Sequence, residues 1–276
     1  MLLRHLRHWF VCALALPGLA VAACGERVTI ATHDGTQMPY SLARPAERLA
    51  VRGALVLLAG GDGHLKLDAQ GCPKALGGNF LVRSASLFRE AGYATALVDV
   101  PTDHQGVGGL AGFRNTEAHG ADLGLVVADL RRRVKGPLWV IGTSRGTISA
   151  ANVASRATGD AAPDGVVLSS ALIHGTTGGV KPWTQQTVFD LSLAAIKVPV
   201  LVIGHVHDQC LRSPPGEMPR LLAQLGSARK QMVSVEGGAG PSGQASLGAC
   251  EGRSPHGYVG QEAATVDTIV RFMQSN

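Results

Sequence analysis

The chain has 276 residues, of which 45% are hydrophobic and only 16% are charged, and its formal net charge is +5. This composition provides ample apolar material for a buried core and excludes an intrinsically disordered chain. The positive excess is small and is not gathered into a basic face with aromatic support, so the sequence predicts no nucleic-acid partner.

The first 23 residues have the pattern of a secretory signal peptide. Arg4 and Arg7 give the start a positive charge, residues 9–19 are apolar, and small residues follow at positions 20, 22 and 23. The apolar stretch is shorter than the ~20 residues that a membrane-spanning helix needs. We therefore expect a cleaved signal at 1–23, no stable membrane span, and one domain over 24–276 that is periplasmic or secreted.

The cysteines bear on the form of export. Residues 21–24 also resemble the lipobox of a lipoprotein, in which Cys24 would carry a lipid anchor. The cysteines that follow the predicted signal are Cys24, Cys72, Cys210 and Cys250. Lipidation of Cys24 would leave three thiols, whereas an oxidising compartment could pair all four as two disulfides. The even count favours a periplasmic or secreted protein over the lipid-anchored alternative.

Short apolar, β-branched runs alternate with amphipathic stretches along the rest of the chain. The predicted strands are 27–32, 38–43, 54–59, 94–100, 138–141, 166–170, 198–203 and 231–235. Helical segments are predicted at 80–91, 117–134, 144–155, 187–196, 217–225 and 261–273. Near-continuous apolar strands that alternate with helices predict an α/β fold, with a mostly parallel central sheet and helices on both faces. Since no long insertion separates the strands, we expect no large lid domain and an open site.

One motif indicates catalysis. Residues 142–146 read Gly-Thr-Ser-Arg-Gly, which matches G-x-S-x-G, with a buried strand before it and an alanine-rich helix after it. A strand-to-helix turn this tight needs small residues beside Ser144, which Gly142 and Gly146 provide. The start of the helix also presents N–H groups and a positive dipole end next to the serine hydroxyl, where an oxyanion would develop.

With this motif the chain resembles the α/β-hydrolase family over nearly the whole of residues 24–276. The family order is nucleophile, acid, histidine. Asp208 follows the apolar strand 198–203, where the family places its acid, and His256 precedes the last helix, where the family places its histidine. The resemblance implies a triad of Ser144, His256 and Asp208, in which the imidazole activates the serine and the carboxylate orients the imidazole.

The resemblance also implies an oxyanion hole. One donor would be the backbone N–H of Arg145, directly after the nucleophile, and the second would come from the glycine-rich loop 60–63. Gly61 is the expected donor in this loop, with Asp62 as the alternative. The position before the loop is Ala59, where many members of the family carry a histidine.

If acid and histidine meet, their loops must lie close together. Cys210 stands two positions after Asp208, and Cys250 stands six positions before His256. We therefore predict a Cys210–Cys250 disulfide that joins the two loops. Cys24–Cys72 is then the remaining pair.

Other residues offer rival interpretations. Asp99 ends a predicted strand and is an alternative acid, or it binds nearby loop amides. His205 and His207 lie beside Asp208, and His64 follows the glycine-rich loop, so a metal site can be considered. These residues are not a complete ligand set with recognisable spacing, which favours surface or pocket-lining positions. Three further histidines are expected to line a substrate pocket or to be exposed: His104, His119 and His174.

The predicted activity is that of a serine hydrolase acting on a carboxylic ester, with acyl transfer to water through an acyl-enzyme and with no cofactor or metal ion. A peptidase, thioesterase or lactone hydrolase on the same triad remains an alternative. A non-catalytic binding protein on the same scaffold is a third. The expected partner is a small-molecule ester or acyl substrate, and the sequence indicates no protein partner.

Overall fold

A computed structural model describes residues 24–175, 185–238, 240 and 243–275. Residues 1–23, to which the signal-peptide prediction applies, lie outside the described residues. No helix in the described part of the chain is long and apolar enough to cross a membrane.

The centre of the molecule is an eight-stranded sheet with the order β1-β2-β4-β3-β5-β6-β7-β8. β2 pairs antiparallel with β1 and β4, and every other neighbouring pair is parallel. The strands are β1 (Glu26–Ala31), β2 (Gln37–Ala43), β3 (Gly53–Leu58), β4 (Tyr93–Val98), β5 (Leu138–Thr143), β6 (Gly165–Ser169), β7 (Val200–His205) and β8 (Lys230–Val235). Because β2 alone runs against the others, the turn after β1 lies at the same edge of the sheet as the carboxyl ends of β3 to β8.

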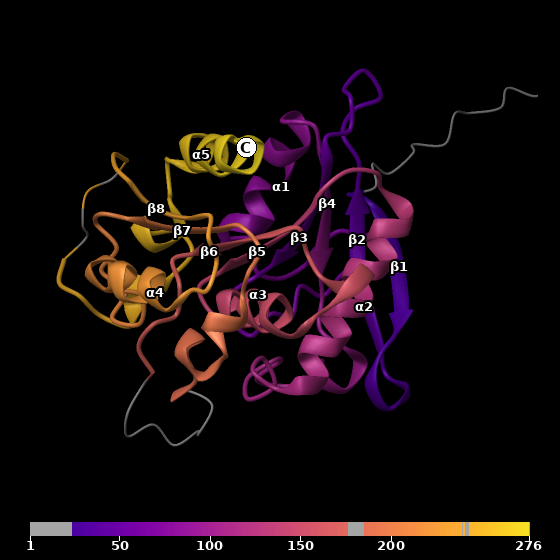
Figure 1. Cartoon of the computed structure of the whole chain (residues 1–276), viewed down its shortest axis with the longest axis horizontal. Coiled ribbons are helices and arrows are strands. Elements are labelled where there is room, and N and C mark those ends of the chain that lie inside the picture. Colours follow the sequence, from indigo (N-terminus) through magenta and orange to yellow (C-terminus); the bar gives the residue numbers. More distant parts are fainter. Residues whose placement is uncertain (1–23, 176–184, 239, 241–242, 276) are drawn as a thin grey trace, which may run out of the picture.

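Helices cover both faces of the sheet (Figure 1). One face carries α1 (Phe80–Glu90) and α5 (Glu262–Gln274), and the other carries α2 (Glu117–Arg133), α3 (Gly146–Arg156) and α4 (Met218–Gln224). Each face has its own apolar core. The predicted α/β architecture with a mostly parallel sheet is confirmed.

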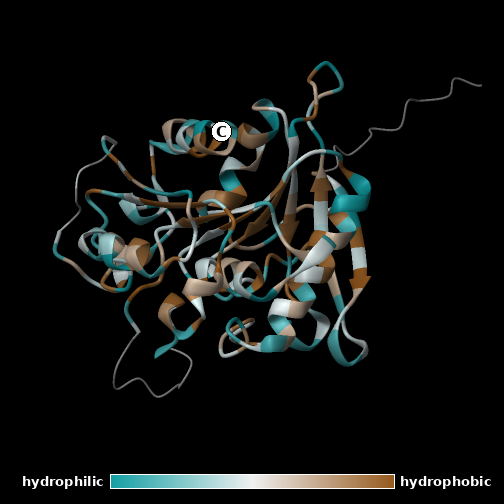
Figure 2. Ribbon diagram, in the orientation of Figure 1, coloured by the Kyte–Doolittle hydropathy of each residue, from teal (hydrophilic) through white to brown (hydrophobic). Residues whose placement is uncertain are grey.

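Burial follows the position of a strand in the sheet. Every residue of β3, β5 and β7 is buried, as continuous apolar runs such as Leu-Trp-Val-Ile predict for strands covered on both faces. The edge strands β1 and β8 keep polar and charged residues exposed, among them Glu26 and Lys230. In Figure 2 the hydrophobic colour accordingly concentrates along the central strands.

Two predicted helices differ from the structure. The helix predicted at 187–196 is two 3₁₀ turns, Val188–Asp190 and Leu193–Ala195. Thr187 and Asp190 cap the start of the first turn, but the extended backbone of Leu191 ends it after three residues. The helix after Ser144 begins only at Gly146, because Ser144 has a left-handed backbone that a helix cannot contain.

Candidate active site

Ser144 lies at the sharp turn between β5 and α3. Its backbone φ is 52°, in the left-handed region that residues with a Cβ rarely occupy. The Ser144 N–H donates to the carbonyl oxygen of Ser169, at the end of β6, over 2.9 Å. The neighbouring strand therefore holds this strained turn in place, at the carboxyl edge of the sheet.

The glycines around the serine are sterically required. A Cβ on Gly142 would lie 2.3 Å from the carbonyl oxygen of Gly146, and a Cβ on Gly146 would lie 2.1 Å from that of Leu58. A Cβ on Gly60 would lie 2.9 Å from the Cβ of Ser144 itself. These close approaches bring α3 and the loop after β3 directly against the serine.

Asp208 and His256 form a buried pair beside this turn. His256 lies in the 3₁₀ turn Pro255–Gly257, and its Nδ1 is 2.8 Å from Asp208 Oδ2. Asp208 Oδ1 accepts a bond from the Cys210 N–H (2.8 Å). Because an ionised carboxylate only accepts, Nδ1 carries the imidazole proton and Nε2 has a free lone pair.

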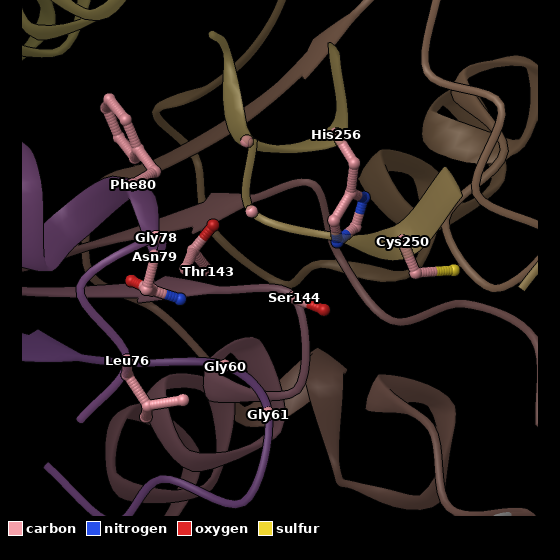
Figure 3. A pocket seen from close by; sticks show the side chains of 12 residues that line it. Gly60, Gly61, Leu76, Gly78, Asn79, Phe80, Thr143, Ser144, Cys250 and His256 are labelled. Atoms are coloured by element: carbon pink, nitrogen blue, oxygen red, sulfur yellow. The ribbon is translucent and has the colours of Figure 1, made fainter. Parts of the chain in front are cut away.

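The second nitrogen of this imidazole is unpaired in the described part of the chain. His256 Nε2 is buried and has no hydrogen-bond partner among the described residues. In Figure 3 one ring nitrogen of His256 points toward Ser144, and both residues line the same pocket. A buried acceptor without a partner costs free energy, which is typical of sites that await a substrate or a moving proton.

The histidine segment is anchored to the sheet. The Tyr258 hydroxyl donates to the carbonyl oxygen of Ile203 (2.9 Å), and Ser170 Oγ donates to that of His256 (2.8 Å). Burial raises the pKa of Tyr258 to about 12, so this hydroxyl keeps its proton. On the other side, the Arg83 guanidinium donates to the carbonyl oxygens of Gly252 (2.9 Å) and Gly257.

The two expected oxyanion donors are available. The N–H groups of Gly61 and Arg145 donate no hydrogen bond within the described part of the chain, and neither does that of Asp62. Gly61 has a φ of 61° and, like Ser144, lines both pockets described below.

A buried arginine supports the loop that contains Gly61. Arg114 is only 3% exposed and donates to the carbonyl oxygens of Ala59 (3.0 Å) and Gly61 (3.5 Å) and to Ser149 Oγ (2.7 Å). Burial, followed by the charge of Arg145, lowers the pKa of Arg114 to about 9. Sequence reasoning missed this residue, since nothing local marks an arginine as buried.

Two pockets meet at Ser144. The first, of about 230 Å³, extends past Asn79, Phe80 and His256. The second, of about 270 Å³, is lined by Arg145, Arg212, Leu172 and Leu247. Gly61, Ser144 and Cys250 line both, so a substrate could place one part on each side of the serine.

Two arginine side chains, Arg145 and Arg212, line the second pocket. Burial lowers the pKa of Arg145, and repulsion by the charge of Arg212 lowers it further, against the opposing effect of Asp62. Burial also lowers the pKa of Arg212. The sequence singled out Arg145 but not Arg212, which follows Asp208 by four positions and reaches the pocket from a different loop than Arg145.

The structure pairs the cysteines as the sequence predicts. Cys210–Cys250 joins the loop of Asp208 to the loop that precedes His256, and Cys24–Cys72 joins the start of β1 to the loop after β3. Main-chain bonds accompany the first bridge, from Leu211 N–H to Ser246 O (3.3 Å) and from Ser246 N–H to Gln209 O (3.0 Å).

The residues considered as an alternative acid or as metal ligands have other hydrogen-bond partners. Both oxygens of Asp99 accept main-chain bonds, from Leu65 (2.7 Å) and Leu67 (2.9 Å), so it binds loop amides and not His256. His205 Nε2 is 3.0 Å from the carbonyl oxygen of Gly237, and its Nδ1 accepts from the His207 N–H. Within the described residues, His205, His207 and His64 belong to no group able to hold a metal ion.

The expectation that His119 lines a substrate pocket or is exposed is wrong. Its side chain is buried, 2.8 Å from Ser149 Oγ, in the network that contains Arg114. Burial, and then the charge of Arg114, lowers its pKa well below 6.5. His174 is exposed, and His104 stacks on Phe113 with ring centroids 4.1 Å apart.

The fold is shared with solved hydrolase structures. A cold-adapted esterase from an Arctic intertidal metagenomic library is 20% identical, with a TM-score of 0.55 over 89% of this chain and 92% of the esterase. A serine hydrolase without a lid from Xanthomonas campestris is 14% identical, with a TM-score of 0.52 and coverage of 88% and 94%. The proline iminopeptidase of Mycobacterium smegmatis is 13% identical, with a TM-score of 0.62 and coverage of 90% and 97%.

These similarities define the class of fold. The chain has the α/β-hydrolase fold, and the likeness to a lid-less member agrees with the expected absence of a large lid. No protein-family model matches the chain, and no curated protein matches it in sequence.

Proposed function

We propose that the chain is a serine hydrolase that cleaves a carboxylic ester, with Ser144, His256 and Asp208 as its catalytic triad. The observation that carries the proposal is the 2.8 Å contact between His256 Nδ1 and Asp208 Oδ2, next to a serine with φ of 52° at a strand-to-helix turn. Esterases and serine hydrolases among the proteins of the same fold support it.

Each group has a definite part in the reaction. His256 Nε2 takes the hydroxyl proton as Ser144 Oγ attacks the ester carbonyl carbon, and Asp208 stabilises the imidazolium that forms. The imidazolium then protonates the departing alcohol, which leaves an acyl-serine. Water, deprotonated by the same nitrogen, releases the acid and restores the serine.

The oxyanion of the tetrahedral intermediate would accept from the N–H groups of Arg145 and Gly61. Neither donor has another partner in the described chain, so neither must break a bond before it acts. One such donor contributes a factor of about 10²–10³ to kcat in enzymes of this type. Arg114 acts only through its hold on the carbonyl oxygens of Ala59 and Gly61.

The test is hydrolysis of p-nitrophenyl esters of graded chain length by residues 24–276, beside Ser144→Ala and His256→Ala. Both variants should lose at least ~10³-fold in kcat, because members of a triad act as one unit. Ser155→Ala, on the same helix but outside both pockets, is the matched control and should keep full activity.

Labelling by a fluorophosphonate distinguishes the alternatives. The wild type should be labelled at Ser144 and the Ser144→Ala variant should not. Faster turnover of amino-acid p-nitroanilides than of esters would favour peptidase activity over esterase activity on the same triad. A chain that is inert and unlabelled would have no activated serine, which would favour the binding-protein alternative.

The arginine pair of the second pocket indicates the class of ester. Arg145 and Arg212 line the space next to Ser144, so we propose that the substrate carries an anionic group on the part that enters this pocket. Monomethyl glutarate and methyl valerate are a matched pair, one with a carboxylate and one without. The anionic ester should have the higher kcat/KM.

Replacing one cation tests this preference. Arg212→Met should lower kcat/KM for monomethyl glutarate by about 10- to 100-fold, the range for one charge-assisted hydrogen bond, and leave methyl valerate within a few-fold. Arg212→Lys should recover part of the loss. Equal effects on the two esters would reject an anionic substrate while leaving the esterase assignment intact.

We also propose that the protein works in the periplasm or outside the cell. Two disulfides support this placement, because such bonds persist in oxidising compartments. Mass spectrometry of the protein recovered from a periplasmic fraction should find a chain that begins at Cys24 without lipid. A lipid on Cys24 would favour the anchored alternative, and a reduced full-length chain would reject export.

A further inference from the structure

Two histidines and an aspartate meet at the same sheet edge, away from the two pockets beside Ser144. His33 lies in the turn between β1 and β2, and Asp103 and His104 lie in the 3₁₀ turn Thr102–His104 after β4. Asp103 Oδ2 is 3.2 Å from His33 Nε2 and 3.6 Å from His104 Nε2. These three atoms all lie within 4.8 Å of one another.

On the side away from Asp103, each imidazole has a hydrogen-bond acceptor beside its Nδ1 atom. His33 Nδ1 is 2.6 Å from Oδ2 of Asp122, a buried residue of α2 whose Oδ1 accepts from the His33 N–H (3.0 Å). His104 Nδ1 is 3.1 Å from the carbonyl oxygen of Gly109. A carboxylate and a carbonyl only accept, so both Nδ1 atoms carry protons. Without a metal ion, His33 Nε2 donates to Asp103 Oδ2 over 3.2 Å, and an ion bound between these two atoms would take the place of that proton.

This arrangement matches the outer shell of protein metal sites. Histidines that bind a metal ion through one nitrogen commonly donate the other N–H to a carboxylate or a backbone carbonyl, which fixes the tautomer and the ring orientation. The stacking of Phe113 on His104, and its ring contact with His33 at 5.0 Å, further restrict both rings.

The two distances from Asp103 Oδ2 to the imidazole nitrogens suit a zinc-sized ion. Ligand atoms about 2.0–2.1 Å from a tetrahedral Zn²⁺ lie about 3.3 Å apart, close to the 3.2 and 3.6 Å separations observed here. We propose that His33, Asp103 and His104 bind one divalent transition-metal ion such as Zn²⁺, with water in the fourth position. Asp103 is 42% exposed in its side chain, so solvent and metal ion can reach the site.

The ion would join parts of the chain that are distant in sequence. His33 connects to the first hairpin and, through Asp122, to α2, whereas Asp103 and His104 belong to the loop after β4. The same loop is hydrogen-bonded to the loop 60–63, since the Leu110 N–H donates to the carbonyl oxygen of Asp62 (2.8 Å). Because a bound ion would connect these segments only in the folded chain, its binding should stabilise the molecule.

Metal titration of residues 24–276, untagged and stripped with EDTA, tests the proposal. Isothermal titration with Zn²⁺ should find one site, and Co²⁺ should give the intense visible absorption of a tetrahedral complex. A hundredfold excess of Zn²⁺ over its Kd should raise Tm by about 5–10 °C. Ser144→Ala should bind equally well, so this result does not depend on the proposed catalytic role.

Two variants within the site and one outside it test the ligands. Asp103→Asn and His104→Gln should each weaken Zn²⁺ binding at least tenfold and lose the Co²⁺ spectrum. His174→Gln, which removes an exposed imidazole elsewhere, should change neither. Absence of stoichiometric binding, or equal binding by Asp103→Asn and His104→Gln with wild type, would show that the three residues form an ion-paired cluster only.

Discussion

At the scale of single residues, two buried aspartates near the same sheet edge have different partners. Asp208 Oδ2 contacts an imidazole nitrogen, whereas the oxygens of Asp99 accept main-chain N–H groups. An asparagine at position 208 would hold His256 in the wrong tautomer without altering the shape of the site. Asp208→Asn should therefore lower kcat by about 10⁴ in the ester assay, with the fold retained.

Asp99→Asn is the matched comparison. It removes a charged acceptor of the Leu65 and Leu67 amides, so the free energy of unfolding should fall by about 1–3 kcal/mol in urea denaturation. Its kcat should stay close to that of the wild type. A large loss of kcat in Asp99→Asn, with little loss in Asp208→Asn, would exchange the two assignments.

His119 makes stability depend on pH. Its pKa in the folded state lies well below 6.5, first because of burial and then because of the charge of Arg114. As pH falls below 6.5, the unfolded state binds a proton that the folded state does not, so the free energy of unfolding must decrease. The decrease from this residue approaches about 1.4 kcal/mol per pH unit at most.

His119→Gln should remove this dependence. Urea unfolding of wild type and variant, with EDTA present, between about pH 7.5 and 5, isolates the contribution of one imidazole from that of the other groups. The wild-type curve should fall more steeply toward low pH. Parallel curves would mean that His119 can be protonated in the folded state.

At the scale of elements, the two disulfides offer a controlled comparison. They close loops with sequence separations of 48 and 40 residues, for which the chain-entropy model gives about 4 kcal/mol each. Only Cys210–Cys250 joins the loops of the proposed acid and histidine. The variants Cys24→Ser/Cys72→Ser and Cys210→Ser/Cys250→Ser should lose similar stability, but only the second should lose most of its esterase activity in conditions where both are folded.

Measurement of Tm and kcat on the same preparations separates the effect on stability from the effect on activity. If the two variants lose activity equally, the Cys210–Cys250 bridge has no special role in positioning His256. If neither loses activity, the main-chain bonds of Ser246 suffice to hold the two loops together.

The elements were largely predictable from the sequence because their apolar runs are nearly continuous. The runs at 138–141 and 198–203 belong to β5 and β7, whose residues are all buried. The segment 187–196 was not predictable, because its pattern is compatible with a helix whereas the extended backbone of Leu191 divides it into two 3₁₀ turns. Strand order, with β2 antiparallel, also depends on pairings that no local pattern contains.

At the scale of the whole molecule, the order of Ser144, Asp208 and His256 along the chain was enough to predict the candidate site. Ser144, Asp208 and His256 each follow or precede a recognisable element, and parallel strands bring their loops to one edge. Arg114 and Arg212 could not be nominated, because their roles depend on side-chain direction and on burial by distant segments. The same holds for the cluster of His33, Asp103 and His104, which joins residues about 70 positions apart.

The placement of the disulfides has a consequence for how the protein would survive proteases. The two bridged loops, 24–72 and 210–250, do not overlap. A single cut of the chain within either loop leaves the two fragments joined by a disulfide. A cut between residues 72 and 210 leaves two fragments with no covalent link between them. A nick between Cys210 and Cys250 would therefore leave the segments of Asp208 and His256 tethered to each other. The covalent link is thus kept between the two loops that hold Asp208 and His256.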